Sequence, residues 1–145
     1  MNVRDIMHSV TIVDATSSVY EVSKLMSKKN IGSVLISFGD EVKGIFTERD
    51  LLNKVVVQGL NAYLTPVEKV MSYPVVSIDA DATVLDASMM LNKHGRIRRL
   101  VVTEAGKIVG ITTARKIAKN LPYHNLETIR HKRDYGRISY YEERK

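Results

Sequence analysis

Hydrophobic and polar positions follow the same order twice along this chain. An apolar lead at residues 3–7 precedes a β-rich run at 10–15, a stretch with helical spacing, and two more β-rich runs at 31–36 and 42–47. The second copy repeats this order, with its lead and runs at residues 67–71, 75–80, 97–102 and 107–113. An internal repeat of this kind indicates a duplicated structural unit, so the fold is expected to contain the same unit twice.

Each copy carries a helix start signal at the same place. Ser18 is followed by Glu21, and Thr83 is followed by Asp86, which is the spacing of a capping box. Downstream, apolar side chains recur at helical spacing in both copies: Val19, Val22, Leu25 and Met26, and then Val84, Ala87, Met90 and Leu91. We therefore expect one amphipathic helix in each copy, with a single buried stripe.

Each copy continues with two apolar runs that flank a polar turn, which is typical of a β-hairpin. The polar turns are residues 39–41 and 104–106. A second helix is expected to begin at Thr47 in the first copy and at Thr113 in the second. Gly59 would end the first of these helices, and the second would end before Pro122. The predicted order of elements is β-α-β-β-α, twice.

This order predicts an α/β (α+β) fold made of two repeats. A right-handed crossover from the first strand through the helix to the second strand places the helices on one face of the sheet. The other face needs cover, most simply from the partner repeat. We expect the repeats, residues 1–61 and 62–121, to pack sheet to sheet about a pseudo-twofold axis with clefts between them. Residues 122–145 follow as a separate tail.

Length and composition fit two small halves that share a core. The chain has 145 residues, and a repeat of about 50 residues is near the lower limit for folding alone. It contains no cysteine, which excludes a disulfide framework and thiol chemistry. The sequence also lacks a signal-like or long apolar segment, so we expect a cytoplasmic protein that does not associate with membranes.

Charge is distributed unevenly along the chain. Residues 1–92 carry 8 basic and 11 acidic side chains, a net charge of −3. Residues 93–119 carry 8 basic side chains against Glu104 alone, a net charge of +7. A basic stretch beside a predicted cleft favours a ligand that carries several phosphates, and its alternative role is a solvated basic face.

Three segments resemble the cystathionine-β-synthase (CBS) domain pair, also called the Bateman module. They are the opening at residues 3–7, the run at 30–36 and, above all, the Gly-Ile-Phe-Thr-Glu-Arg-Asp sequence at 44–50. The resemblance covers residues 3 to about 120 and implies a regulatory module that changes the activity of a partner protein. It also implies adenosine-containing ligands, AMP, ADP, ATP or S-adenosylmethionine, in the clefts between the repeats, no obligatory cofactor, and association into disc-like homodimers.

The segment from Thr47 to Asp50 is the first candidate for a nucleotide site. Where a strand ends and a helix begins, unpaired N–H groups and the helix dipole favour an anion such as phosphate. Thr47 would add a hydroxyl group, Asp50 would accept hydrogen bonds from the two ribose hydroxyls, and Arg49 would contact phosphate. Ile45 would form apolar wall. The alternative is that Thr47 and Asp50 are only a capping box.

By resemblance, the rest of this pocket comes from the other repeat. The segment before its first strand and the start of its second strand would border the ligand, and the residues concerned are Ser72, Tyr73, Pro74, Val75, Ile97, Arg98 and Arg99. Backbone groups there would read the adenine edge, and the arginines would face phosphate.

The second copy departs from this pattern because Lys116 stands where the acid would be. An ammonium group pairs with oxyanions and not with a neutral diol, so this second pocket is doubtful. Its predicted lining is Val10, Thr11, Ile31, Gly32, Ser33, Thr113 and Lys116. We expect one competent adenosine site per chain.

The tail at residues 122–145 holds four tyrosines among six basic and four acidic side chains. Basic residues interleaved with aromatic ones could bind nucleic acid, but no groove-reading motif accompanies them, and the same residues suit a strap that packs on the domain or on a dimer mate. A third alternative is a structural dimerisation module with degenerate pockets. The four histidines lack metal-ligand spacing and no Ser/His/acid set stands in a recognisable motif, so neither a metal site nor enzyme activity is expected.

Overall fold

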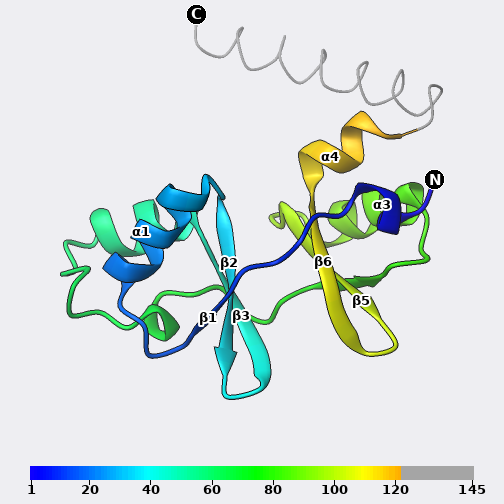
Figure 1. The fold of residues 1–145 in the computed structure, drawn as a ribbon. Coiled ribbons are helices and arrows are strands. Elements are labelled where there is room, and N and C mark those ends of the chain that lie inside the picture. Colours follow the sequence, from blue (N-terminus) through cyan, green and yellow to red (C-terminus); the bar gives the residue numbers. More distant parts are fainter. Residues whose placement is uncertain (122–145) are drawn as a thin grey trace, which may run out of the picture. The chain divides into compact units, whose positions relative to one another are not determined.

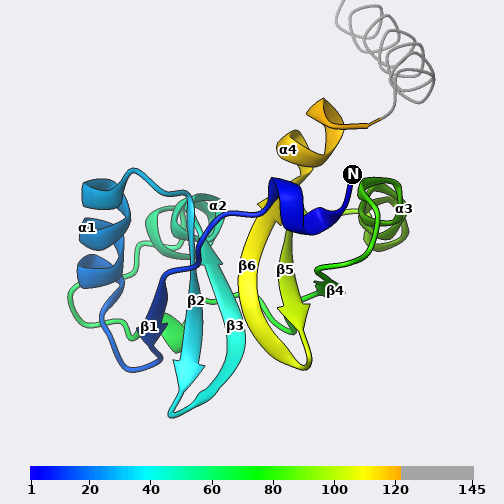
Figure 2. The same ribbon diagram turned by 45° about the vertical axis from the view of Figure 1, so that its right-hand side comes forward.

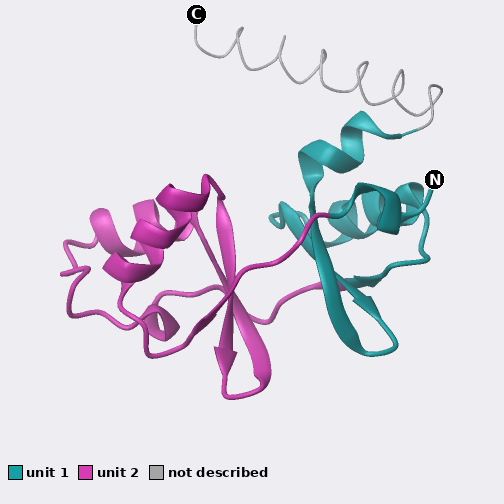
Figure 3. Ribbon diagram, in the orientation of Figure 1, with its two compact units in different colours: residues 1–7, 78–145 teal, residues 8–77 magenta. Residues whose placement is uncertain are grey.

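The computed structural model describes residues 1–121 (Figure 1). The chain divides into two compact units (Figure 3), and these units are not simply the two sequence repeats. Unit 2 is His8–Ser77, whereas unit 1 joins Met1–Met7 to the chain from Ile78 onward. The apolar lead of each sequence repeat therefore packs with the other repeat.

Unit 2 has the predicted β-α-β-β-α order. Its elements are β1 (Ile12–Asp14), α1 (Val19–Lys29), β2 (Ser33–Phe38), β3 (Glu41–Thr47), α2 (Glu48–Asp50), the π-helix η2 (Leu51–Val56) and the 3-10 helix η3 (Val67–Lys69). The three strands form a sheet in the order β1-β2-β3. β1 pairs with β2 in parallel, as a crossover through α1 requires, and β2 pairs with β3 as an antiparallel hairpin.

Unit 1 has the same order of elements. They are the 3-10 helix η1 (Val3–Ile6), β4 (Ser77–Asp79), α3 (Val84–His94), β5 (Arg99–Glu104), β6 (Lys107–Thr113) and α4 (Ala114–Lys119). The sheet order is β4-β5-β6, and β5 and β6 form the second hairpin. Both hairpins have a register shift at the matching place, between Ile36 and Ser37 and between Val102 and Thr103, which confirms the duplication.

Both predicted N-cap residues, Ser18 and Thr83, are confirmed, and of these two the reciprocal capping box is complete only at Thr83 and Asp86. The Ser18 hydroxyl accepts a hydrogen bond from the Glu21 amide at 3.1 Å at the start of α1. Thr83 and Asp86 form a reciprocal capping box at the start of α3, with both bonds at 3.0 Å. The hydrogen bond from the Thr83 N–H, together with the Thr83 hydroxyl, lowers the pKa of the Asp86 carboxyl below its ordinary value.

The helix predicted from Thr47 to Gly59 forms, but its second part is not α-helical. Leu51–Val56 is a π-helix, and hydrogen bonds between residues five apart continue beyond it, from Val57 N–H to Leu52 O and from Leu60 N–H to Val55 O, each at 3.0 Å. Gly59 has a positive φ of 68°, which is the conformation expected of a glycine that ends a helix.

The core of unit 2 lies between one face of its sheet and the helices beside it. Figures 1 and 2 show α1 lying along the sheet. The buried side chains come from α1, β2, β3, η2 and η3, and include Val19, Val22, Met26, Val34, Ile36, Phe46, Val55, Val67 and Val70. Each contributes about 1.5 to 3 kcal/mol relative to an exposed side chain, so this cluster dominates the stability of the unit.

Two glycines make room for two methionines. A Cβ atom on Gly44 of β3 would overlap the side chain of Met71, and one on Gly110 of β6 would lie 2.7 Å from the sulfur atom of Met7. Each methionine ends the apolar lead that packs across a strand of its unit. The glycines are therefore needed for this close packing, which adds a reason beyond the strand pairing expected for them.

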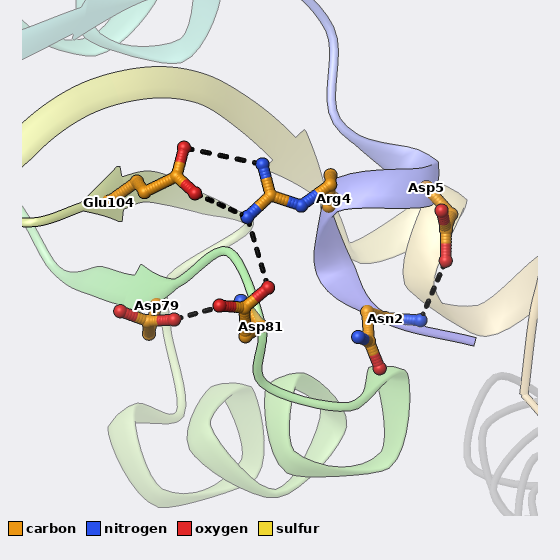
Figure 4. A network of polar contacts seen from close by, with 6 residues as sticks. All are labelled: Asn2, Arg4, Asp5, Asp79, Asp81 and Glu104. Carbon is orange, nitrogen blue, oxygen red and sulfur yellow. Dashed lines mark hydrogen bonds and ion pairs between the residues drawn. The ribbon is translucent and has the colours of Figure 1, made fainter.

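The N-terminal segment is tied to unit 1 by backbone and side-chain contacts. Val3 N–H donates to Ala82 O at 2.8 Å, and Arg4 N–H donates to Ala80 O at 3.0 Å. The Arg4 guanidinium bridges Asp81 at 3.0 Å and Glu104 at 2.6 Å (Figure 4). Arg4 lowers the pKa of the Glu104 carboxyl below its usual value. This network attaches the start of the chain to β5 and to the loop before α3.

The tail at residues 122–145, with its predicted nucleic-acid or strap role, lies outside the described residues. Within residues 1–121, no helix is long and apolar enough to cross a membrane.

Candidate functional site

Thr47 and Asp50 hold each other at the junction between β3 and α2. The Asp50 N–H donates to Thr47 Oγ1 at 3.2 Å, and the Thr47 N–H donates to Asp50 Oδ2 at 3.1 Å. This is a complete capping box. Thr47 and Asp50 therefore do form the capping box that was the alternative to ligand binding. This box occupies only Oδ2, one of the two oxygens of the Asp50 carboxylate.

The other oxygen of Asp50 faces residues outside the helix start. Asp50 Oδ1 accepts a hydrogen bond from Ser72 Oγ at 2.8 Å and an ion pair from Lys54 Nζ at 3.1 Å. Asp50 is only 6% exposed. Carboxylates are seldom buried without specific partners. Asp50 with its three partners, Thr47, Lys54 and Ser72, is called the Asp50 constellation below, and it is more than a surface cap.

Ser72 is held beside Asp50 by backbone pairing. Its N–H donates to Ile45 O at 2.8 Å and its C=O accepts from Ile45 N–H at 2.9 Å, which extends the edge of β3 by one bridge. Because this bridge lies within unit 2, Ile45, Thr47, Asp50 and Ser72 come from a single compact unit. The sequence placed Ser72 in the opposite repeat; the structure packs it with the first.

Lys54 belongs to the constellation and was not predicted. Its ammonium group donates to Met71 O at 3.3 Å and to Ser72 Oγ at 3.1 Å, besides pairing with Asp50. The side chain is 42% exposed, so one side of the network is open to solvent. The i,i+4 spacing of Asp50 and Lys54 was the available signal, since side chains four apart share a helix face.

The remaining residues of the predicted site are more scattered. Arg49 is exposed at the start of the helix, and the side chain of Tyr73 is 73% exposed. Pro74 is exposed and follows a cis peptide bond, and Val75 is half-buried. The three other predicted residues, Ile97, Arg98 and Arg99, belong to unit 1, where the Arg98 carbonyl accepts the Ala114 N–H at 2.8 Å. Their predicted part in the site stays a prediction.

The matching position in unit 1 has different chemistry. Thr113 caps α4 by accepting the Lys116 N–H at 3.2 Å, but an ammonium group cannot accept the reciprocal bond from Thr113. The Lys116 side chain is exposed, and its carbonyl accepts from Asn120 Nδ2 at 2.8 Å. Unit 1 therefore holds no carboxylate where unit 2 holds Asp50.

The other residues predicted for the second pocket lie in unit 2 and are half-buried: Val10, Thr11, Ile31, Gly32 and Ser33. Ser33 pairs with Thr47 across the hairpin, and the Gly32 carbonyl accepts the Glu48 N–H at 3.1 Å. The structure thus brings these two residues to the start of α2, next to the first candidate site.

The Asp50 constellation has the chemistry of a hydrogen-bond acceptor site. An ionised carboxylate offers about four acceptor positions, and three are occupied by Thr47, Ser72 and Lys54. The site suits a ligand that donates through hydroxyl or amino groups. Among the described residues, no group of three or more His, Cys, Asp or Glu side chains is placed to hold a metal ion.

A family model, curated relatives and solved structures that match this chain all point to the same family. The CBS domain family matches residues 3–57 and again residues 67–123. The CBS domain-containing protein YhcV of Bacillus subtilis is 32% identical over 120 residues, which cover 82% of this chain and 84% of that protein. An uncharacterized protein of Methanopyrus kandleri is 40% identical over 110 residues, 74% of this chain, and this chain spans 56% of its length. The crystal structure of a CBS-domain containing protein from Agrobacterium tumefaciens has a TM-score of 0.71 at 31% identity, covering 81% of this chain and 91% of that one.

Proposed function

We propose that this chain, which belongs to the CBS domain family, is a regulatory sensor that binds an adenosine nucleotide at Asp50 and thereby changes the activity of a partner protein. AMP, ADP and ATP are the preferred ligands, and S-adenosylmethionine is the alternative within the same class. The proposed site consists of Ile45, Thr47, Asp50 and Ser72 in unit 2. The cell compartment in which we place this activity is the cytoplasm.

The buried Asp50 carboxylate is the observation that carries this proposal. A negative charge that is 6% exposed costs free energy to bury, and a cap alone does not require it, since Asp86 forms the same capping box while exposed. Asp50 also has an unfilled acceptor position and a partner, Lys54, that reaches solvent. These features suit a ligand with vicinal hydroxyls, such as a ribose.

A phosphorylated ligand is favoured by the charges near the candidate site. Lys54 lies within the constellation, and Arg49 is exposed one residue before Asp50. These positive charges would repel the sulfonium group of S-adenosylmethionine and attract phosphate, which is why we rank the nucleotides first.

Isothermal titration calorimetry with AMP, ADP, ATP, S-adenosylmethionine and GTP tests the proposal. We expect at least one adenosine nucleotide to bind below millimolar concentration, and 2′-deoxy-AMP to bind more weakly than AMP because it donates one hydrogen bond fewer. Lys116→Ala, at the matching position of unit 1, is the control and should leave the affinity unchanged. The proposal fails if no adenosine ligand binds below millimolar concentration, or if AMP and its deoxy analogue bind equally.

Self-association into a homodimer is the second part of the proposal. Large apolar side chains are exposed in the segment after α2, at 45–79%: Leu52, Val56, Val57, Leu60, Tyr63 and Leu64. Exposed apolar residues gathered in one segment are typical of protein contact surfaces. We expect light scattering to give a dimer mass for the wild type and a monomer mass for Leu52→Glu, with Asn53→Glu as the control. A monomeric wild type would contradict this part.

A further inference from the structure

The three partners of Asp50 leave one hydrogen-bond acceptor position free, whereas a ribose diol needs two. Its Oδ2 accepts from the Thr47 amide, and its Oδ1 accepts from Ser72 Oγ and Lys54 Nζ. With about four acceptor positions on a carboxylate, one remains. A vicinal diol donates two hydrogen bonds, so one of the three present donors must leave before both hydroxyls can bind.

The three donors differ in how readily they can move. The Thr47 amide is fixed by the helix start, and Ser72 is held by two backbone bonds to Ile45. Lys54 is attached through a flexible side chain and is 42% exposed, so water can take over its hydrogen bonds when it turns outward. Lys54 is therefore the donor that a ligand would displace.

We propose that Lys54 determines which ligands this site accepts: it occupies an acceptor position of Asp50 in the free protein, leaves when a ribose diol binds, and then pairs with a phosphate of the same ligand. This inference rests on the proposed nucleotide binding at Asp50. It adds Lys54 to the proposed site and states which ligands this residue favours. The 5′-phosphate is attached to the ribose whose diol meets Asp50, so it lies within reach of a lysine side chain displaced from that carboxylate.

The physical consequence is a preference for charged over neutral nucleosides. Adenosine breaks the ion pair between Lys54 and Asp50 without replacing it. AMP breaks the same pair but gives the ammonium group an oxyanion in return. The site should therefore discriminate between two ligands that share the same base and the same sugar.

Calorimetry with adenosine and AMP on four proteins tests this rule. In Lys54→Met the affinity for adenosine should rise and that for AMP should fall, so that the ratio of the two affinities changes by at least about tenfold. Lys54→Arg keeps the positive charge and should keep the preference for AMP. Lys43→Met is the matched control, because Lys43 is an exposed lysine of the same unit whose ion pair is with Glu41.

A purely structural role for Lys54 predicts a different result. If Lys54 only fastens Met71 and Ser72, Lys54→Met should weaken adenosine and AMP by the same factor and leave the ratio unchanged, which would overturn the inference. If none of adenosine, AMP, ADP, ATP and S-adenosylmethionine binds the wild type or Lys54→Met, the proposed function itself is wrong and the inference falls with it. Binding with an unchanged ratio overturns the inference alone.

The free protein supplies a measurement that needs no ligand. In nitrogen-15 spectra of the lysine ammonium groups, the protons of Lys54 should exchange with water more slowly than those of Lys43, and Asp50→Asn should remove this difference. Addition of AMP should shift the Lys54 signal and leave the Lys43 signal in place. Equal exchange of the two ammonium groups in the free wild type would show that Lys54 does not occupy Asp50, and would overturn the inference.

Discussion

Asp50→Ala should lower the free energy of unfolding by about 1.5 kcal/mol. The change removes the acceptor for the Thr47 amide and for the Ser72 hydroxyl, two part-buried hydrogen bonds worth about 1 kcal/mol each. The ion pair with Lys54 adds little, because that ammonium group is 42% exposed and returns to water. Alanine restores about 0.5 kcal/mol through its higher helix propensity.

Lys116→Ala is the matched control for this measurement. Lys116 occupies the same repeat position, begins a helix behind the same threonine cap, and is exposed. Its removal should change the stability by less than about 0.5 kcal/mol. Urea unfolding followed by circular dichroism gives both values, and Asp50→Ala should also lower the melting temperature by about 3 to 6 °C.

A double-mutant cycle identifies the source of the loss. Asp50→Ala combined with Ser72→Ala should be less destabilising than the sum of the single changes, by about 1 kcal/mol, because the two side chains share one hydrogen bond. The reasoning is refuted if Asp50→Ala unfolds at the same urea concentration as Lys116→Ala, or if the two changes at Asp50 and Ser72 are additive.

Three further changes have defined outcomes. Gly44→Ala should destabilise unit 2 by about 1 to 3 kcal/mol, since a Cβ atom there overlaps Met71, and a urea midpoint equal to the wild type would contradict this. Arg4→Met should destabilise the protein more at pH 7 than at pH 3: Arg4 holds the pKa of Glu104 below its usual 4.5, so the stability it contributes is fully present above that pH and is lost as the pH falls through the lowered pKa. A loss of stability that is the same at both pH values would argue against this. Deletion of residues 122–145 should leave nucleotide binding unchanged and remove any salt-dependent binding to polyanions; loss of nucleotide binding would contradict the proposed site.

The sequence predicted those features of the fold that have local causes. A hydroxyl and a carboxylate three residues apart set each helix start, as Thr83 and Asp86 do, and a polar turn between two apolar runs set each hairpin. The π-helix at Leu51–Val56 has no such signal, because the apolar positions that bury one side of an α-helix also bury one side of a π-helical turn.

The candidate site was predicted in part for the same reason. Thr47 and Asp50 are neighbours in sequence, so their contact could be expected. The place of Ser72 beside Asp50 was expected only from the family resemblance. It does not follow from the residues alone, because it depends on an edge pairing with Ile45 across 27 positions of the chain. Lys54 was missed because its role appears only when Ser72 and Asp50 are both in place. Long-range backbone pairing, not residue type, completes the constellation.

The apolar lead of each sequence repeat packs with the other repeat, and this places part of the candidate site next to a connection between the two units. The chain passes between the two compact units twice, after Met7 and after Ser77. Ser72, which donates to Asp50, lies in the segment that leads to the second passage. In the proposed mode of binding a ligand displaces Lys54, and Ser72 keeps its hydrogen bond to Asp50. The same carboxylate would therefore hold the ligand and fasten the segment next to the second passage, and in the matching position of unit 1 Lys116 provides no such link.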